Sequence, residues 1–266
     1  MLAIDRVVCS DSPRREIGVA GWCAFDDLTP AYDLWVECGG RRTPCLAGLP
    51  RPDVAAAVHA EAAAASGFVV RFSVDRRADR ARVIGRRAGH DVRLGHIPID
   101  RRLTNDGKRT SHRPAEGPII SILLSASSAH LYHLHRSVES VADQTHTQWE
   151  LCVTAKGAGD SRAVDYLTAR LQEDRRIKIT DAPAGAFVMR LDAGDELHPD
   201  ALMEIAAAAT ADRQVEVIYS DEDWIDQLGI HARPLFKPEF DIDLLDRKST
   251  RLNSSHVSES RMPSSA

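Results

Sequence analysis

The sequence has little that would carry it into or across a membrane. It contains no run of about 20 apolar residues, the length needed to span a bilayer. The first residues, MLAIDRVVCSDSPRRE, lack the basic-then-apolar order of a secretory signal. We therefore expect a cytoplasmic protein. A peripheral association of the full-length protein with a membrane is compatible with this expectation.

Basic residues are not in excess, and the cysteines show no pairing pattern. The 34 Lys and Arg residues oppose 39 Asp and Glu residues, for a formal net charge of −5. Such a chain has no general electrostatic attraction to nucleic acid, so we expect no nucleic-acid partner. The five cysteines are odd in number and include no CxxC pair. Buried thiols in a reducing compartment are the favoured interpretation, and a zinc site is the minor alternative.

The C-terminal segment lacks any apolar period. Residues 246–266 read DRKSTRLNSSHVSESRMPSSA and are rich in serine. They resemble the conceptual translation of a common sequencing-library adapter. The resemblance covers DRKSTRLNSSH and SRMPSSA, which lie on either side of a short segment that corresponds to the variable index of the adapter. We therefore expect a non-native, disordered tail and a natural reading frame interrupted near Leu245. A natural disordered Ser-rich tail is the alternative.

The first part of the chain, residues 1–98, has the pattern of a small β-sandwich-like domain. Its apolar segments, which predict strands, are 18–25, 32–38, 66–74 and 91–97. A glycine pair, Gly39-Gly40, follows the second segment and predicts a hairpin turn. The polar residues 99–117, which include glycine and proline, predict a linker.

Tryptophans in this first part admit two interpretations. Trp22 and Trp35 could provide stacking platforms for a glycan. Core positions are favoured for both, because large aromatic side chains are most often used to fill a core. The arginine-dense stretch 76–93 contains aspartates between its basic residues, so it indicates a solvated face rather than a site for an anionic partner.

The second part, residues 118–245, alternates apolar strands with amphipathic helices. The predicted strands are 118–124, 149–153, 177–180, 187–191 and 215–219. The first predicted helix buries one face, marked by Leu131, Leu134, Val138 and Val141. A second helix is expected from about Ser161 to Glu173, and a third after Pro199. Strand–helix–strand alternation favours an α/β fold with a mainly parallel sheet and right-handed crossovers.

Acidic residues follow two of these predicted strands. Asp192 and Asp195 come directly after strand 187–191, and Asp221 and Asp223 come after strand 215–219. Ligands of open α/β sheets bind at the carboxyl ends of strands. Carboxylate oxygens there suit a hard divalent cation that bridges phosphates. Simple capping of helices and loop ends is the alternative for such acids.

At these residues the chain resembles a family. The runs GAFVMRLDAGDELHPDAL and YSDEDWID…FKPEFDIDLL, with SVESVADQTHTQWELC before them, resemble the nucleotide-binding half of family 2 glycosyltransferases of bacterial O-antigen and rhamnan assembly. The first part, with GWC, LPRPDVAAA and SGFVVRFSV, resembles an accessory domain that precedes some bacterial glycosyltransferase domains. The implied fold is a partial, Rossmann-type GT-A domain.

The resemblance implies a chemistry. It is the transfer of a sugar from a nucleotide-sugar donor to a glycan or lipid-linked glycan acceptor, by an inverting enzyme that uses Mn²⁺ or Mg²⁺. Asp192 and Asp195 would hold the metal, and Asp221 and Asp223 would join them in donor binding. The general base of the family would lie beyond Leu245, so we expect this chain alone to be inactive.

The chain also departs from the family pattern. Residues 125–128 read SASS where the family has a Pro-x-Tyr-Asn-like turn, and Ala155 and Lys156 stand where paired aspartates are usual. Only residues 181–184 remain of a longer turn, and Gly194 replaces the third residue of the acid–x–acid–acid motif. These departures keep a second hypothesis open, a non-catalytic glycosyltransferase-like binding or scaffold module.

A histidine trio completes the candidate residues. His130, His133 and His135 could bind zinc or copper. Helical spacing places His130 and His133 together and turns His135 away, so a solvated surface is favoured.

Overall fold

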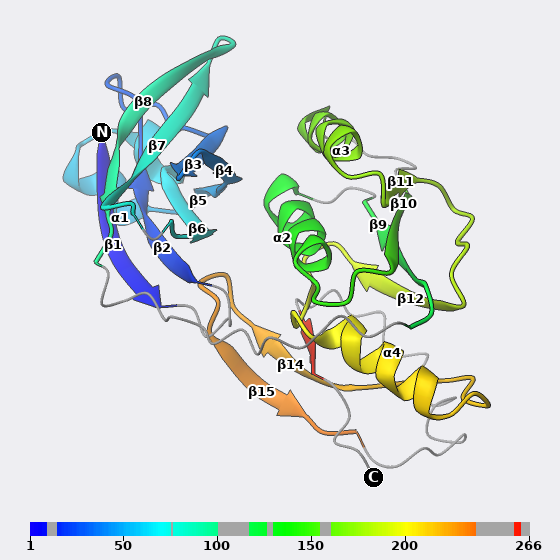
Figure 1. The fold of residues 1–266 in the computed structure, drawn as a ribbon. Coiled ribbons are helices and arrows are strands. Elements are labelled where there is room, and N and C mark those ends of the chain that lie inside the picture. The colour runs from blue at the N-terminus through cyan, green and yellow to red at the C-terminus, as the bar shows by residue number, and fades with distance from the viewer. Residues whose placement is uncertain are drawn as a thin grey trace. The chain divides into compact units, whose positions relative to one another are not determined.

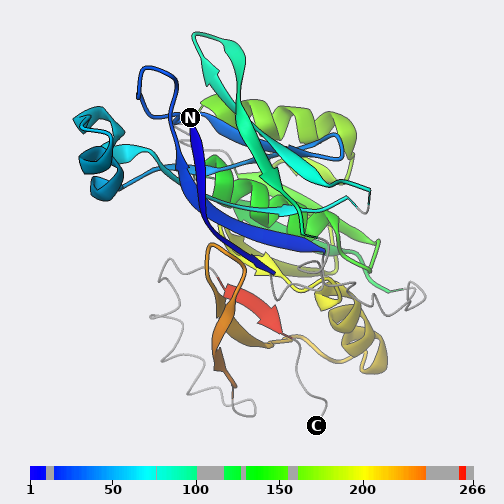
Figure 2. The same ribbon diagram turned by 90° about the vertical axis from the view of Figure 1, so that its left-hand side faces the viewer.

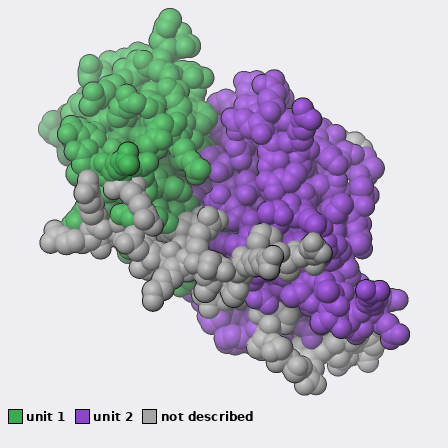
Figure 3. Space-filling view, in the orientation of Figure 1, with its two compact units in different colours: residues 1–109, 225–231 green, residues 110–224, 232–266 purple. Residues whose placement is uncertain are grey.

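The computed structural model describes residues 1–9, 15–75, 77–100, 117–126, 130–154 and 161–237, and the backbone of 258–261. The chain divides into two compact units, coloured separately in Figure 3. Unit 1 comprises Met1–Arg109 and Ile225–His231, and unit 2 comprises Thr110–Trp224 and Ala232–Ala266. Each unit has its own hydrophobic core.

The described residues form an α/β chain with four four-stranded sheets (Figure 1). Two sheets are wholly antiparallel, one is wholly parallel and one is mixed. The expected parallel sheet is therefore present, but antiparallel pairs predominate over the chain as a whole. Among the described residues, no helix is both long and apolar enough to cross a bilayer.

Unit 1 consists of two antiparallel sheets around one core. The first sheet has the order β1-β2-β6-β5 and contains β1 (Leu2–Cys9), β2 (Glu16–Cys23), β5 (Leu46–Leu49) and β6 (Gly67–Ser73). The second has the order β4-β3-β7-β8 and contains β3 (Leu34–Cys38), β4 (Arg41–Pro44), β7 (Arg80–Arg87) and β8 (His90–Pro98). Helix α1 (Pro52–Ala57) and the 3₁₀ turn η1 (Glu61–Ala65) connect β5 to β6.

Sequence pattern accounts for the strands of unit 1. In β3 the side chains of Leu34, Val36 and Cys38 are buried, while the alternate positions are half-buried. The predicted hairpin turn is confirmed, because Gly39 and Gly40 have φ angles of 57° and 81° and connect β3 to β4. Such positive angles favour glycine. The arginine-dense stretch forms the β7–β8 hairpin, which Figure 2 shows from a second side.

Neither tryptophan of unit 1 is an open platform. Trp22 and Trp35 are both half-buried, and Trp35 Nε1 donates a hydrogen bond to Asp33 Oδ1 at 2.9 Å. The cysteines of the chain are free thiols, and four of the five are buried. Burial raises the pKa of Cys23 to about 12, which leaves the thiol protonated and unreactive at neutral pH.

Unit 2 is built on the parallel sheet. Its order is β11-β10-β9-β12, from β9 (Ile120–Ser125), β10 (Trp149–Thr154), β11 (Ile177–Ile179) and β12 (Phe187–Asp192). The helices of unit 2 are α2 (Leu131–Ala142), α3 (Ser161–Glu173) and α4 (Ala201–Ala211). The core joins apolar residues of this sheet to those of all three helices. The predicted apolar face of α2 is confirmed, since its four marker residues are at most 2% exposed.

The two faces of the parallel sheet are covered differently. The chain steps in one direction from β9 to β10 to β11, so right-handed crossovers place α2 and α3 on one face. It then returns across the sheet to β12 through residues 180–186, which contain no helix. This return segment is attached through Glu150, which accepts a hydrogen bond from the backbone N–H of Ala184 at 2.6 Å.

One strand prediction is wrong. Residues 215–219 do not form a strand, and Val217 within them is 54% exposed. The strand is β14 (Asp221–Ile225), which contains the acidic residues themselves and buries Asp223 and Ile225 on alternate positions. Of the apolar residues before it, Val215, Ile218 and Tyr219 are only half-buried, and the strand begins at the acids rather than ending there.

The mixed sheet of unit 2 has the order β13-β16-β14-β15. Its other strands are β13 (Glu196–Leu197), β15 (His231–Leu235) and β16 (Ser258–Arg261). Strand β16 pairs with β13 in parallel and with β14 antiparallel. Most of residues 246–266 lie outside the described residues, so their assignment as a non-native tail stays a prediction.

Candidate functional site

Asp192 lies at the carboxyl end of β12, in register with Ser125 at the end of β9. The strand order reverses between these two neighbours, since β10 and β11 lie on one side of β9 and β12 lies on the other. In open parallel sheets the crevice at such a reversal, outside the carboxyl ends of the strands, is where ligands bind. The sheet therefore places Asp192 at the position where a ligand site is expected.

A tight turn connects Asp192 to Asp195. The backbone N–H of Asp195 donates to Asp192 O at 2.9 Å. Gly194 within the turn has a φ of 115°, a conformation that residues with a side chain rarely adopt. The glycine that replaces a family acid is thus the residue that allows this turn, which we call the acid loop (residues 192–195).

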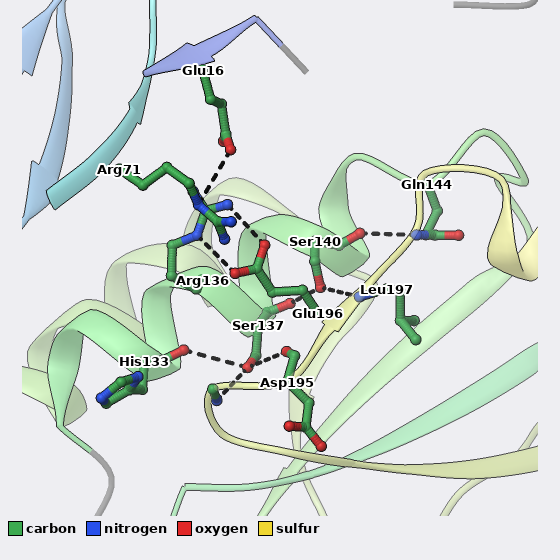
Figure 4. Close-up of polar contacts among 11 residues, drawn as sticks. Glu16, Arg71, His133, Arg136, Ser137, Ser140, Gln144, Asp195, Glu196 and Leu197 are labelled. Carbon is green, nitrogen blue, oxygen red and sulfur yellow. Dashed lines mark hydrogen bonds and ion pairs between the residues drawn. The ribbon is translucent and has the colours of Figure 1, made fainter. Parts of the chain in front are cut away.

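Ser137, near the middle of α2, holds the acid loop in place (Figure 4). Its hydroxyl accepts a hydrogen bond from Gly194 N at 2.8 Å and donates to Asp195 O at 2.8 Å. Asp192 O and His133 O lie farther from the same oxygen, each at 3.3 Å. Because a hydroxyl carries one proton, the short contact with Asp195 is the principal donated bond.

Two further polar residues, Ser140 of α2 and Gln144 just beyond its C-terminal end, hold the chain that follows the acid loop. Ser140 Oγ accepts from Leu197 N at 3.1 Å. Gln144 Oε1 accepts from Leu202 N at 2.9 Å, and its Nε2 donates to His198 O at 2.8 Å. Ser137 and Ser140 lie on one face of the helix, because residues three apart are neighbours there, and Gln144 continues this polar stripe beyond the helix end. This polar stripe therefore fixes the path from the acid loop to α4.

A buried ion pair anchors the same segment. Arg136 of α2 donates from Nη2 to Glu196 Oε2 at 2.8 Å and from Nε to Glu196 Oε1 at 3.2 Å. The two side chains are 4% and 6% exposed. Two parallel bonds between guanidinium and carboxylate fix direction as well as distance. Glu196 directly follows Asp195, so the pair locks one end of the acid loop against the helix (Figure 4).

The second acidic pair lies apart from the first. Asp221 is half-buried and its Oδ1 accepts from Lys237 N at 2.8 Å, while Asp223 is 3% exposed. Strand β16 separates β13 from β14, and adjacent strands lie about 4.8 Å apart, so Asp223 is about 10 Å from Glu196 across the sheet. The described parts of the chain contain no group of three His, Cys, Asp or Glu residues that could hold a metal ion.

The histidine trio is less exposed than expected. His130 Nδ1 accepts from Tyr132 N at 3.2 Å and so caps α2. His133 is half-buried, and burial, with the nearby His130, lowers the pKa of its imidazole. His135 is 8% exposed and packs edge-on against Tyr166, with ring centroids 5.3 Å apart. The expectation of a solvated surface is therefore wrong for His135, which fills the space between α2 and α3.

Some family departures fall where the structure gives no description. Ser127, Ser128, Ala155 and Lys156 lie outside the described residues. Ser125 is exposed at the end of β9, and Ala126 after it is buried. The polar stripe of α2 was missed from sequence. Its only signal is small polar residues on a helix face that also borders the apolar core.

Comparison with known proteins gives a limited likeness. No protein-family model matches the chain. Over 149 residues it is 28% identical to the O-antigen biosynthesis protein RfbC of Myxococcus xanthus. This match covers 50% of this chain and 12% of that protein. Over 149 residues it is also 29% identical to uncharacterized protein y4gI of Sinorhizobium fredii (strain NBRC 101917 / NGR234). That match covers 50% of this chain and 16% of y4gI. The likeness thus spans a small part of either relative.

Proposed function

We propose that this chain contributes the donor-binding half of a GT-A-like, Rossmann-type glycosyltransferase domain that acts in polysaccharide biosynthesis. The observation that carries this proposal is the acid loop, which lies at the point where the strand order of the parallel sheet reverses. The likeness to an O-antigen biosynthesis protein supports the same class of pathway. The donor would be a nucleotide sugar, and the acceptor a glycan or a lipid-linked glycan.

The residues present fit a divalent cation that takes only part of its ligands from the protein. Asp192 and Asp195 supply two carboxylates, and Gly194 supplies none. Mg²⁺ is usually held by one or two carboxylates, with waters and substrate phosphates completing its shell, and Mn²⁺ prefers the same oxygen ligands. When bound, the cation would neutralise charge on the diphosphate of the donor. The protein's own contribution is to fix the backbone of the loop that carries the two carboxylates.

A general base for the acceptor hydroxyl is not assigned within the described residues. Sugar transfer is therefore proposed for the whole protein and not for this chain alone. The protein would work in the cytoplasm, where nucleotide sugars are made. Asp221 and Asp223 are assigned to the donor side, but their distance from the acid loop makes them outer contacts rather than metal ligands.

The first test is binding of metal and nucleotide together. We expect UDP, GDP or dTDP to raise the melting temperature of the chain only when Mn²⁺ or Mg²⁺ is also present, because the nucleotide must complete the metal shell. The gain at a ligand concentration of 100 times Kd is about 2.7 kcal/mol. The double substitution Asp192→Asn/Asp195→Asn should abolish the rise, measured by differential scanning fluorimetry.

Asp165→Asn is the matched control, because Asp165 is exposed on α3, away from the acid loop. It should leave the rise unchanged. The absence of any rise in the unsubstituted chain would favour the scaffold hypothesis, which the missing carboxylate at Gly194 supports. If the chain does bind nucleotide, an assay of sugar transfer by the intact gene product distinguishes a catalytic module from a scaffold that binds nucleotide without catalysis.

A second test concerns Ser137 as a positioning residue. Ser137→Ala and Ser140→Ala each leave a buried backbone N–H without its acceptor, so each should lower the free energy of unfolding by about 1–3 kcal/mol. Only Ser137 contacts the acid loop. We therefore expect Ser137→Ala alone to weaken metal-dependent nucleotide binding, by about tenfold, equal to about 1.4 kcal/mol. Titration calorimetry measures both variants, and equal affinities would show a purely structural role for Ser137.

A further inference from the structure

Unit 1 contains a cavity of about 300 Å³ between the loop after β2 and the β7–β8 hairpin. Phe25, Asp26 and Asp27 line it from the loop, and Arg87, Arg93 and Leu94 line it from the hairpin. Ligand pockets range from about 300 to 1,000 Å³, so this cavity has room for a single small ring rather than a nucleotide. All of these residues belong to unit 1, and none belongs to the acid loop.

One wall of the cavity contains a surface ion pair. Arg87 Nη2 donates to Asp27 Oδ2 at 2.6 Å, and the guanidinium lies 5.1 Å from the centroid of the Phe25 ring. Asp27 also accepts from Thr29 Oγ1 at 2.7 Å. The hydrogen bond from Arg87, followed by that from Thr29, holds the pKa of Asp27 well below its usual range. Arg87 is thus held by an ion pair and a ring, and its other N–H groups stay available to a ligand.

The rest of the lining combines opposite charges with apolar surface. Asp26 and Arg93 are exposed, and the described residues provide no ion pair or side-chain hydrogen bond for either. Val92 and Leu94 add apolar surface beside them. The cavity therefore presents one acceptor side chain and two donor side chains next to apolar groups. A free anion would meet two carboxylates there, and a free cation would meet two guanidinium groups.

We propose that this cavity binds one neutral pyranose unit. Sugar hydroxyls can donate to Asp26 and accept from Arg93 and Arg87, while the C–H face of the ring packs on Leu94 and Val92. A neutral ligand with many hydroxyls satisfies both charges without leaving either one desolvated and unpaired. That the sugar belongs to the acceptor polysaccharide rests on the proposed function. The cavity would then bind one unit of the acceptor chain, while the acid loop binds the donor.

The test uses the full chain with simple sugars and without nucleotide or metal. Methyl α-L-rhamnopyranoside, methyl α-D-mannopyranoside and methyl β-D-glucopyranoside are titrated at millimolar concentrations into ¹⁵N-labelled protein. We expect amide shifts confined to residues 25–27 and 87–94 for at least one sugar. Asp26→Asn and Arg93→Gln should each weaken binding by about tenfold or more, since each removes a charged hydrogen-bond partner.

Glu61→Gln and Arg41→Gln are the matched controls, because both residues are exposed in unit 1 and neither lines the cavity. They should leave sugar affinity unchanged. Shifts elsewhere, binding unaffected by Asp26→Asn and Arg93→Gln, or preference for inorganic phosphate over every sugar would each overturn the proposal. Sugar binding without metal-dependent nucleotide binding in the unsubstituted chain would overturn the proposed function alone, and nucleotide binding without sugar binding would overturn the present proposal alone.

Discussion

Replacement of Arg136 by alanine is expected to lower the free energy of unfolding by about 3–5 kcal/mol. The substitution leaves the carboxylate of Glu196, which is 6% exposed, buried without its two hydrogen bonds to the guanidinium. Removing one member of a buried ion pair costs more than the pair contributed, because that member no longer offsets the desolvation of the remaining charge. Urea denaturation at neutral pH, followed by circular dichroism, measures the change.

Two further variants make this expectation specific. Arg136→Met/Glu196→Leu removes both charges and should recover most of the lost stability, since apolar pairs of similar volume often replace buried ion pairs without loss. Arg80→Ala breaks an ion pair whose side chains are 57% and 69% exposed, so it should cost less than about 1 kcal/mol. A loss of similar size for Arg136→Ala would mean that water reaches Glu196.

Replacement of Glu150 by glutamine is expected to remove a pH-dependent part of the stability. Glu150 accepts hydrogen bonds from Lys178 Nζ, Ser121 Oγ and Ala184 N, each at 2.6 Å. The bond from Lys178 first, and then those from Ser121 and Ala184, lower its pKa from 4.5 to about 2. A lowered folded-state pKa stabilises the fold above pH 4.5, and that contribution is lost as the pH falls toward about 2.

The wild-type chain should therefore exceed Glu150→Gln in stability by about 1–3 kcal/mol at pH 7, and the gap should close as the pH approaches 2. Denaturant unfolding across this pH range measures the gap. Lys178→Met should reduce the same pH dependence, because the hydrogen bond from Lys178 is the largest cause of the lowered pKa of Glu150. A gap that stays constant with pH would show that Glu150 does not titrate in this range.

Local patterns predicted the regular elements of unit 2 well. The buried face of α2 follows from the spacing of four apolar residues, and α3 begins and ends where its amphipathic pattern does. The parallel order of β9, β10 and β11 follows from alternation of strands and helices. In these elements each residue's environment depends on neighbours three or four positions away, which the sequence displays directly.

Long-range polar contacts could not be predicted in the same way. Asp221 and Asp223 were expected at the end of a strand, but pairing with β16 and a hydrogen bond from Lys237 place them within one. The cavity of unit 1 also joins Asp26 to Arg93 from separate elements. Such contacts depend on which strands pair, and no local spacing encodes that choice.

The hydrogen bond between Ser137 and Gly194 joins residues 57 positions apart in the chain. Between them lie β10, α3, β11 and β12, so this contact closes a loop that contains most of the parallel sheet. Closing so long a segment costs conformational entropy, which the contacts of the sheet must offset. We therefore expect the acid loop to be among the last parts of unit 2 to form during folding. A partly folded chain would display the same aspartates without the geometry that makes them a site.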